Sequence, residues 1–206
     1  MVSGVRVKIC GITNLEDAQA AASFGADALG FIFAKSPRRI SPQKAKRITR
    51  SLGPWVTAVG VFVDEDVNVI RRIASECALH GVQLHGSESV SKIRGLSSYS
   101  VIKTFHVSES LDWKKTKNSP ADAFLFDTCA PGRWGGTGIR FDWNLLKSRS
   151  FDKPFIVSGG LNPGNVGRVI HELSPYGVDV SSGVERSPGK KDRKLLREFL
   201  QNAKKD

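Results

Sequence analysis

The sequence predicts an α/β fold, a single-domain (β/α)8 TIM barrel with eight parallel strands that spans residues 1–206. Three observations support this fold class. Short apolar runs alternate with longer amphipathic stretches along the whole chain, which is the pattern of right-handed βαβ units with parallel pairing. Eight such units use up the chain with no segment left over, which favours a closed barrel over an open sheet. Capping residues stand where several of the predicted helices begin.

The predicted strands and helices follow one another strictly in turn. The strands are expected at residues 5–10, 26–33, 56–63, 82–85, 100–105, 123–127, 155–158 and 178–181. The helices that follow them are expected at residues 15–24, 42–51, 67–78, 90–96, 109–117, 143–147, 163–173 and 193–204. Because 206 residues are few for eight such units, the connecting loops must be short.

Helix-start chemistry supports three of the predicted helices. Asn14 precedes an acidic first turn, where a capping side chain and negative charge both stabilise the exposed backbone N–H groups. Ser41-Pro42 and Asn162-Pro163 each place a capping side chain before a proline at the first helical position, where an N–H group is not needed. We therefore expect helices to begin at residues 15, 42 and 163.

The chain is strongly basic, with a formal net charge of +11 and a sequence pI of about 9.8. Three origins are open: a solvated surface without function, a field that attracts an anionic metabolite, and a nucleic-acid interface. The Lys and Arg residues are spread along the chain, and their denser groups fall where surface helices are expected, without interleaved aromatic residues. This distribution favours the solvated surface, leaves the anionic substrate open, and counts against nucleic-acid binding.

The sequence shows no sign of a membrane span or an export signal. No run of eighteen apolar residues occurs, and residues 1–4 lead into a strand without the basic and apolar regions of a signal peptide, so we expect a cytoplasmic protein. The three cysteines, Cys10, Cys77 and Cys129, are odd in number and lack metal-ligand spacing, which predicts reduced thiols. Cys77 is expected to be a small buried apolar residue within a helix. We expect no metal or cofactor, and a monomer rather than a homodimer.

Side-chain alternation along the strands predicts which polar residues face the barrel interior. In the first strand the apolar face must pack under the helices, which leaves Lys8 and Cys10 inside. The same alternation directs further side chains inward, namely Gln83, His85, Leu125, Asp127, Asp179 and Ser181. Because the first and eighth strands are neighbours in a closed barrel, we expect Lys8 and Asp179 to form an internal ion pair.

Two of these inward residues, Cys10 and Asp127, stand at the carboxyl ends of their strands. Enzymes with this barrel do their chemistry at that end, so we interpret both as functional rather than as polar residues that merely satisfy a neighbour. The loop at residues 128–139 is rich in glycine, and strands and helices alternate without a break beyond it. This favours a mobile loop over the active site rather than a linker between domains.

Two glycine turns indicate a phosphate site. Gly159-Gly160 follows the seventh strand, and Ser182-Gly183 follows the eighth. Glycine lets backbone N–H groups approach an anion closely, and phosphate sites in this barrel are commonly built from the loops after strands seven and eight. The alternative, that these are tight turns only, is the weaker interpretation because both turns stand in those two places.

Motifs in order along the chain resemble the phosphoribosylanthranilate isomerase family. They are KICGIT at 8–13, GFIF at 30–33, SPRRISP at 36–42, GVFV at 60–63, VQLHG at 82–86, FDT at 126–128, GGTG at 135–138, FDW at 141–143, SGGLNP at 158–163, DVSSGVE at 179–185 and PGKKD at 188–192. The resemblance spans nearly the whole chain, and the least familiar stretch lies at residues 129–134.

The resemblance implies an activity and a set of roles. The reaction of the family is the Amadori rearrangement of N-(5-phosphoribosyl)anthranilate to 1-(2-carboxyphenylamino)-1-deoxyribulose 5-phosphate in tryptophan biosynthesis. By this resemblance Cys10 would be the general base, Asp127 the general acid, and Arg38 a contact of the anthranilate carboxylate. The glycine turns at 159–160 and 182–183 would hold the phosphate of this small phosphosugar substrate.

The chemistry of that reaction needs these residue types. Opening the furanose ring requires a proton on the ring oxygen, and the resulting iminium loses its C2′ proton to a base, so an acid and a base must act together. Neither step calls for a metal or a redox cofactor. Interior Lys8 should favour the thiolate of Cys10. His85 is an alternative base, although a histidine satisfied by hydrogen bonds is the favoured interpretation.

Rival functions remain open from the sequence. Other phosphosugar barrels, such as ribulose-phosphate epimerase or indole-glycerol-phosphate synthase, share the fold, and so does a dual-substrate isomerase of histidine and tryptophan synthesis. Dual-substrate barrels of that kind typically use two aspartates as acid and base, so Cys10 counts against them. A nucleic-acid-binding module, from another class, would need a platform of aromatic and basic residues that the sequence does not show.

Overall fold

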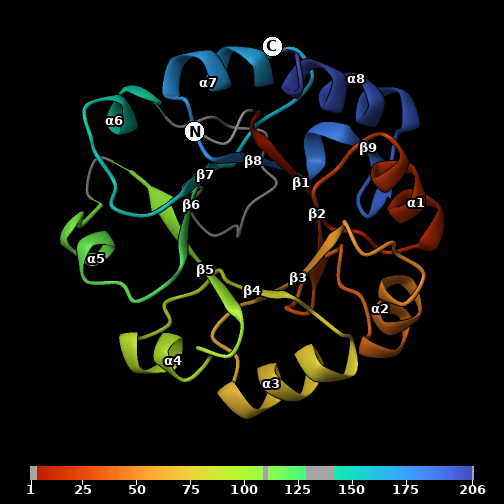
Figure 1. Ribbon diagram of the computed structural model, residues 1–206, viewed down its shortest axis with the longest axis horizontal. Helices are drawn as coiled ribbons and strands as arrows, with labels where there is room; N and C mark the ends of the chain where they lie inside the picture. The colour runs from red at the N-terminus through yellow and green to blue at the C-terminus, as the bar shows by residue number, and fades with distance from the viewer. Residues whose placement is uncertain (1–3, 109–110, 129–141, 206) are drawn as a thin grey trace.

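Eight parallel strands close into a barrel in the computed structural model, with each strand paired to the next and β8 paired to β1 (Figure 1). The structure describes residues 4–108, 111–128 and 142–205. The strands are β1 Arg6–Cys10, β2 Ala28–Ile32, β3 Thr57–Phe62, β4 Gly81–Leu84, β5 Ser100–Val107, β6 Ala123–Thr128, β7 Phe155–Val157 and β8 Gly177–Val180. The predicted (β/α)8 barrel is confirmed.

Helices surround the ring of strands in chain order (Figure 1). They are α1 Leu15–Ser23, α2 Pro42–Thr49, α3 Val67–Glu76, α4 Val90–Arg94, α5 Lys114–Lys117, α6 Asn144–Lys147, α7 Val166–Leu173 and α8 Arg193–Ala203. The hydrophobic core lies between this outer layer and the barrel wall, where Val7, Ile9, Val178 and Val180 are buried as the alternation predicts. Cys77, at the end of α3, is fully buried in the same layer, which confirms its predicted place.

Two of the three predicted helix starts are confirmed by their capping contacts. Asn14 accepts from the backbone N–H of Asp17 at 2.8 Å, and Ser41 accepts from that of Lys44 at 3.3 Å. Each contact satisfies one N–H group of a first turn that has no partner within its own helix.

The third predicted helix start is wrong. Asn162 accepts from the backbone N–H of Gly164 at 2.9 Å, so its side chain closes a turn over the proline, and α7 begins at Val166 instead of residue 163. A capping side chain and a following proline fit such a turn as well as they fit a helix start, because both residues favour turns.

The segment after β5 also departs from the prediction. The helix expected at 109–117 is confined to Lys114–Lys117, and Asp112 accepts from the backbone N–H of Lys114 at 3.0 Å at its start. Residues 109–110 lie outside the described part of the chain. β5 runs to Val107 rather than ending at residue 105, and this extension carries His106 to the barrel mouth.

A short hairpin between β8 and α8 was not predicted. After the turn η1 Ser182–Val184, strand β9 Glu185–Ser187 pairs antiparallel with β10 Lys190–Lys191. The sequence prediction treated this stretch as a simple connection. The hairpin instead turns Glu185 and Lys191 toward the barrel mouth, where both make ion pairs.

No helix within residues 4–108, 111–128 and 142–205 is both long and apolar enough to cross a membrane. The predicted active-site loop at 128–139 and Cys129 fall almost wholly outside the described residues, since the described part stops at Thr128 and resumes at residue 142. The assignment of the whole chain to one domain stays a prediction, as does its cytoplasmic location.

Candidate active site

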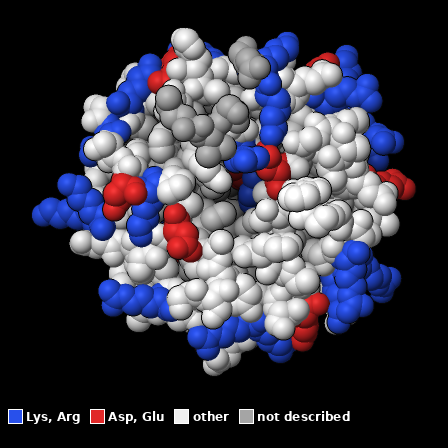
Figure 2. All heavy atoms as spheres, viewed as in Figure 1, with Lys and Arg blue, Asp and Glu red and all other residues white. Residues whose placement is uncertain are grey.

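A pocket opens at the carboxyl ends of the strands, and we call it the mouth pocket. It is lined by all the residues that the sequence predicts for the site, namely Cys10, Arg38, Asp127, Gly159, Gly160, Ser182 and Gly183. Gln83, His85 and Asp179 line it as well. The space-filling view is hollowed at its centre (Figure 2). The fold thus gathers at one mouth residues that are dispersed along the sequence.

The ion pair predicted inside the barrel is present. Lys8 Nζ donates to Asp179 Oδ1 at 2.7 Å, and Ser158 Oγ donates to Asp179 Oδ2 at 3.1 Å. Lys8 lies opposite Asp179 in the β1–β8 register, so the contact follows from strand closure. Burial opposes the charge on Lys8, but the attraction of Asp179 outweighs it and raises the pKa of Lys8 above its ordinary value.

Cys10 ends β1 and lies buried on the wall of the mouth pocket. Burial raises the pKa of its thiol above the ordinary value, and Lys8 is the strongest influence in the opposite direction. Lys8 therefore favours the thiolate as expected, but the loss of hydration around the sulfur outweighs this influence, and the net pKa of the thiol is raised.

Asp127 lies near the end of β6 and is held on both carboxylate oxygens. Oδ1 accepts from the backbone N–H of Thr128 at 2.8 Å, and Oδ2 lies 3.4 Å from His85 Nε2. Gly159 packs against the same carboxyl group, because a Cβ atom there would lie 2.8 Å from Asp127 Oδ1 and would also collide with Thr128. The carboxyl group therefore keeps one orientation at the mouth.

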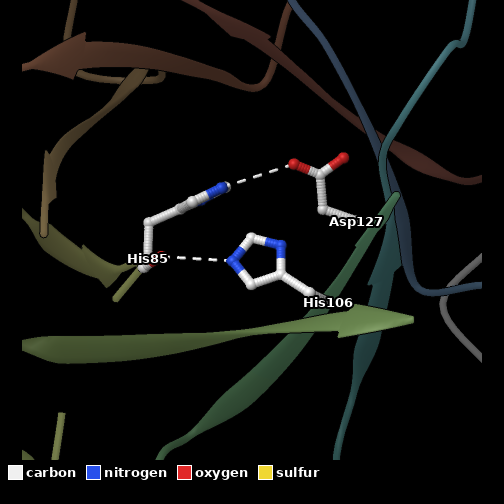
Figure 3. Close-up of side chains that lie close together, drawn as sticks. All are labelled: His85, His106 and Asp127. Carbon is white, nitrogen blue, oxygen red and sulfur yellow. Dashed lines mark hydrogen bonds and ion pairs between the residues drawn. The ribbon is translucent and has the colours of Figure 1, made fainter. Parts of the chain in front are cut away.

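His85 has polar neighbours on both ring nitrogens, as the sequence interpretation favoured. Nε2 faces Asp127, and Nδ1 lies 3.1 Å from Gln83 Nε2. His106, from β5, stands beside it with the two ring centroids 5.0 Å apart (Figure 3). Burial, with a further contribution from His85, lowers the pKa of His106, so its imidazole is neutral at neutral pH.

The Arg38 side chain is held by a clamp formed by Glu185 and Lys191 of the hairpin. Arg38 Nε donates to both carboxylate oxygens of Glu185 at 3.0 Å, and Nη2 donates to Oε2 at 2.8 Å. Lys191 Nζ donates to Glu185 Oε1 at 2.9 Å and to the Cys10 carbonyl at 2.6 Å. The same hairpin thus restrains both the guanidinium group and the end of β1.

Opposite charges stabilise the ionised clamp. Burial alone would favour the neutral form of Glu185, yet the hydrogen bond from Arg38 and the charge of Lys191 lower its pKa. Burial lowers the pKa of Lys191, although Glu185 opposes that shift. Glu185 uses the Nε–Nη2 edge of the guanidinium group, so the Nη1 end of Arg38 is left for a second anion.

Known proteins that resemble this sequence identify the family of the chain. Residues 7–202 match the family described as N-(5'phosphoribosyl)anthranilate (PRA) isomerase. The chain belongs to this isomerase family. The N-(5'-phosphoribosyl)anthranilate isomerase of Desulforudis audaxviator is 48% identical over 200 residues, which cover 96% of this chain and 97% of that protein.

Solved structures of phosphoribosylanthranilate isomerases agree with the fold. The isomerase of Thermotoga maritima has a TM-score of 0.89 and 46% identity, covering 97% of this chain and 98% of that one. Another structure, in complex with reduced 1-(o-carboxyphenylamino)-1-deoxyribulose 5-phosphate, has a TM-score of 0.86 and 45% identity with the same coverage. A further Thermotoga maritima structure is of monomers generated from the dimeric isomerase. For this chain, the monomer stays a prediction.

Within this isomerase family's fold, sequence reasoning missed the clamp and His106. Glu185 and Lys191 stood in quoted motifs but received no role, because nothing local to them points to Arg38. His106 was missed because the predicted fifth strand ended at residue 105, two residues before the end of β5. The side-chain alternation of that strand, continued from Thr104, would have directed His106 inward.

The positively charged side chains are concentrated at the edge of the face shown in Figure 2. Lys and Arg side chains lie mostly around its outer edge, over the surrounding helices, and a few stand nearer the central hollow. This agrees with the solvated surface that the sequence favours, and Arg38 is a cation at the mouth pocket itself.

Proposed function

We propose that this chain catalyses the Amadori rearrangement of N-(5-phosphoribosyl)anthranilate to 1-(2-carboxyphenylamino)-1-deoxyribulose 5-phosphate in tryptophan biosynthesis, with Cys10 as general base and Asp127 as general acid. The observation that carries the proposal is that Cys10 and Asp127 line one pocket together with Arg38 and the two glycine turns. Membership of the isomerase family supports the reaction, and a family structure holds a reduced form of the product.

Catalysis would begin at the sugar ring. Asp127 donates a proton to the furanose oxygen, the bond from that oxygen to the anomeric carbon breaks, and the anthranilate nitrogen becomes an iminium. Cys10, as thiolate, then removes the proton from C2′, and the electron pair of that bond forms the enolamine. Loss of the proton from the C2′ hydroxyl and protonation of C1′ give the ketone. The sum is an isomerisation in which no atom is gained or lost.

The thiol of Cys10 must ionise for its part in this sequence. Burial keeps it protonated in the protein without substrate, while Lys8 beneath it favours the thiolate. The Lys8–Asp179 pair is fixed in the barrel interior, so this influence is present before substrate binds and needs no rearrangement. We therefore expect turnover to rise with pH as Cys10 ionises.

Two groups of residues suit the ends of the substrate. The Nη1 end of Arg38, which the bonds to Glu185 do not use, would bind the anthranilate carboxylate through charge-assisted hydrogen bonds, which are strong and directional for a guanidinium group. Gly159 and Gly160 both have positive φ, 85° and 65°, and such successive backbone turns direct N–H groups toward an anion. Gly183 permits close packing, because a Cβ atom there would collide with the Leu161 carbonyl.

The test is turnover of purified variants, followed by the loss of phosphoribosylanthranilate fluorescence. Cys10→Ala and Asp127→Ala are each expected to lower turnover by about two orders of magnitude or more, with unchanged circular dichroism. Cys77→Ser is the matched control, since it removes a thiol that lies in the core away from the mouth pocket. Near-normal turnover in either active-site variant would remove that residue from the mechanism.

A further inference from the structure

Three metal-ligand side chains meet beside the mouth pocket, from three consecutive strands (Figure 3). His85 follows β4, His106 lies in β5, and Asp127 lies in β6. One ligand atom of each, a ring nitrogen or a carboxylate oxygen, lies within 4.8 Å of the other two. Two imidazoles and a carboxylate form a donor set that suits zinc and related divalent transition metals.

The strand register fixes this grouping. His106 is the register partner of Asp127 in the β5–β6 pair, and His85 Nε2 already lies 3.4 Å from Asp127 Oδ2. Zinc–ligand bonds of about 2.0–2.2 Å in a tetrahedral site hold their ligand atoms roughly 3.3–3.6 Å apart. The widest pair here must therefore close by about 1 Å, which is within the reach of side-chain rotation.

The surroundings of both rings match the needs of metal-bound histidine. A metal-ligating imidazole usually donates its second N–H to a carbonyl or carboxylate oxygen. His106 Nε2 lies 3.4 Å from the His85 carbonyl, an oxygen of the kind that orients a metal-bound imidazole. For His85, the neighbour at Nδ1 is the carboxamide of Gln83 at 3.1 Å.

Gln83 can present either atom of its carboxamide to His85. Its side chain is buried, and among the described residues its Oε1 atom has no hydrogen-bond partner that a half-turn would break. A half-turn of the carboxamide brings Oε1 to the position now held by Nε2, where it accepts from Nδ1–H of His85. That tautomer turns the lone pair of His85 Nε2 toward Asp127, as metal binding requires.

We propose that His85, His106 and Asp127 bind a divalent transition-metal ion of the zinc class, and that the bound ion inhibits the isomerase by withdrawing Asp127 from proton transfer. Only the inhibition rests on the proposed function; the binding does not. A carboxylate bound to the ion cannot protonate the furanose oxygen. A fourth ligand position would be left for water, because three protein ligands do not complete a tetrahedral site.

Binding is tested on the full-length protein after treatment with EDTA. Zinc chloride is titrated calorimetrically, and Co²⁺ is used as a spectroscopic probe whose visible absorption reports tetrahedral nitrogen and oxygen ligands. His106→Ala is expected to weaken binding of both ions at least tenfold. His171→Ala is the control, because His171 is an exposed histidine on α7. No saturable binding to the unaltered protein, or equal affinity in His106→Ala, overturns the proposal.

A soft thiolate in the same pocket is the competing ligand, and the same titration separates it. If Cys10 holds the ion, Co²⁺ gives an intense near-ultraviolet sulfur charge-transfer band and Cys10→Ser abolishes binding, which overturns the assignment. If the proposal holds, Cys10→Ser retains the affinity of the unaltered protein within about threefold. Cys10 lines the mouth pocket together with His85 and Asp127, so the distinction is necessary.

Inhibition is measured on turnover with rising zinc, followed by reversal with EDTA. The unaltered protein should lose more than nine-tenths of its activity at saturating zinc and recover it with EDTA. His106→Ala should keep basal turnover within about twofold and lose the zinc sensitivity. Saturable binding without inhibition overturns the inhibitory role. If the unaltered protein shows no isomerase activity at all, the proposed function fails, while the Co²⁺ spectrum still decides the metal site.

Discussion

Replacing Glu185 by alanine gives a sharp test of the clamp, because it removes one carboxylate and leaves two cations behind. The side chains of Glu185 and Lys191 are 4% and 0% exposed, and that of Arg38 is 14% exposed. Removing one partner of a buried ion pair costs about 3–5 kcal/mol, since the remaining charge is neither paired nor hydrated.

The expected magnitude lies at the lower end of that range. Lys191 keeps its hydrogen bonds to the carbonyls of Cys10 and Ser181 at 2.6 and 3.1 Å, which partly stabilise the ammonium group. We therefore expect Glu185→Ala to lower the free energy of unfolding by about 3 kcal/mol. For a chain of this length that corresponds to a fall in Tm of roughly 6–12 °C. Glu185→Gln keeps the shape and one acceptor, so its loss should be smaller.

The assay is thermal and urea unfolding together with steady-state kinetics. Glu172→Ala is the matched control, because Glu172 also pairs with two cations, Arg168 and Lys147, but both of these are exposed and screened by water. The control should unfold close to the unaltered protein. In Glu185→Ala the released Arg38 should raise KM more than it lowers kcat. Stability equal to that of the control would refute the idea that the hairpin holds Arg38.

Further predictions follow from the same pocket. Arg38→Ala should raise KM at least tenfold with a smaller change in kcat, if its guanidinium binds the substrate carboxylate; steady-state kinetics with both parameters unchanged rule this out. Gly159→Ala should destabilise the protein more than Gly25→Ala and also reduce turnover, because both glycines have positive φ but only at Gly159 would a Cβ atom meet Asp127. Because burial raises the pKa of Cys10, its alkylation by iodoacetamide should be slow at neutral pH and increase with a midpoint above that of the unfolded chain; mass spectrometry of the Cys10 peptide measures this, and a lower midpoint contradicts it.

Local sequence patterns lead to correct predictions where the physical cause is itself local. Alternation along β1 and β8 placed Lys8 and Asp179 inside the barrel, and the ion pair follows once the barrel closes. The caps at Asn14 and Ser41 act within three residues of each helix start, so they too could be predicted. At Asn162 the capping side chain accepts a hydrogen bond within a turn instead, so the predicted helix start at residue 163 was wrong.

The predicted site residues share one pocket because all strands of the barrel are parallel. Cys10 ends β1 and Asp127 lies one residue before the end of β6, and parallel strands in a barrel present their carboxyl ends on one side. Their position could therefore be predicted, but not the ionisation of Cys10. The pKa of Cys10 depends on the balance between burial and the charges of Lys8 and Asp179, which is a property of the whole surroundings.

The sequence by itself determined the strand and helix order, the side of each strand that faces inward, and the family. Tertiary structure alone decided the clamp on Arg38, whose partner Glu185 is 147 residues away, and the meeting of His85, His106 and Asp127 at the ends of three strands. Periodicity and capping depend on neighbours a few residues apart, whereas ion pairs, metal-ligand groups and burial depend on which distant segments the closed barrel brings into contact.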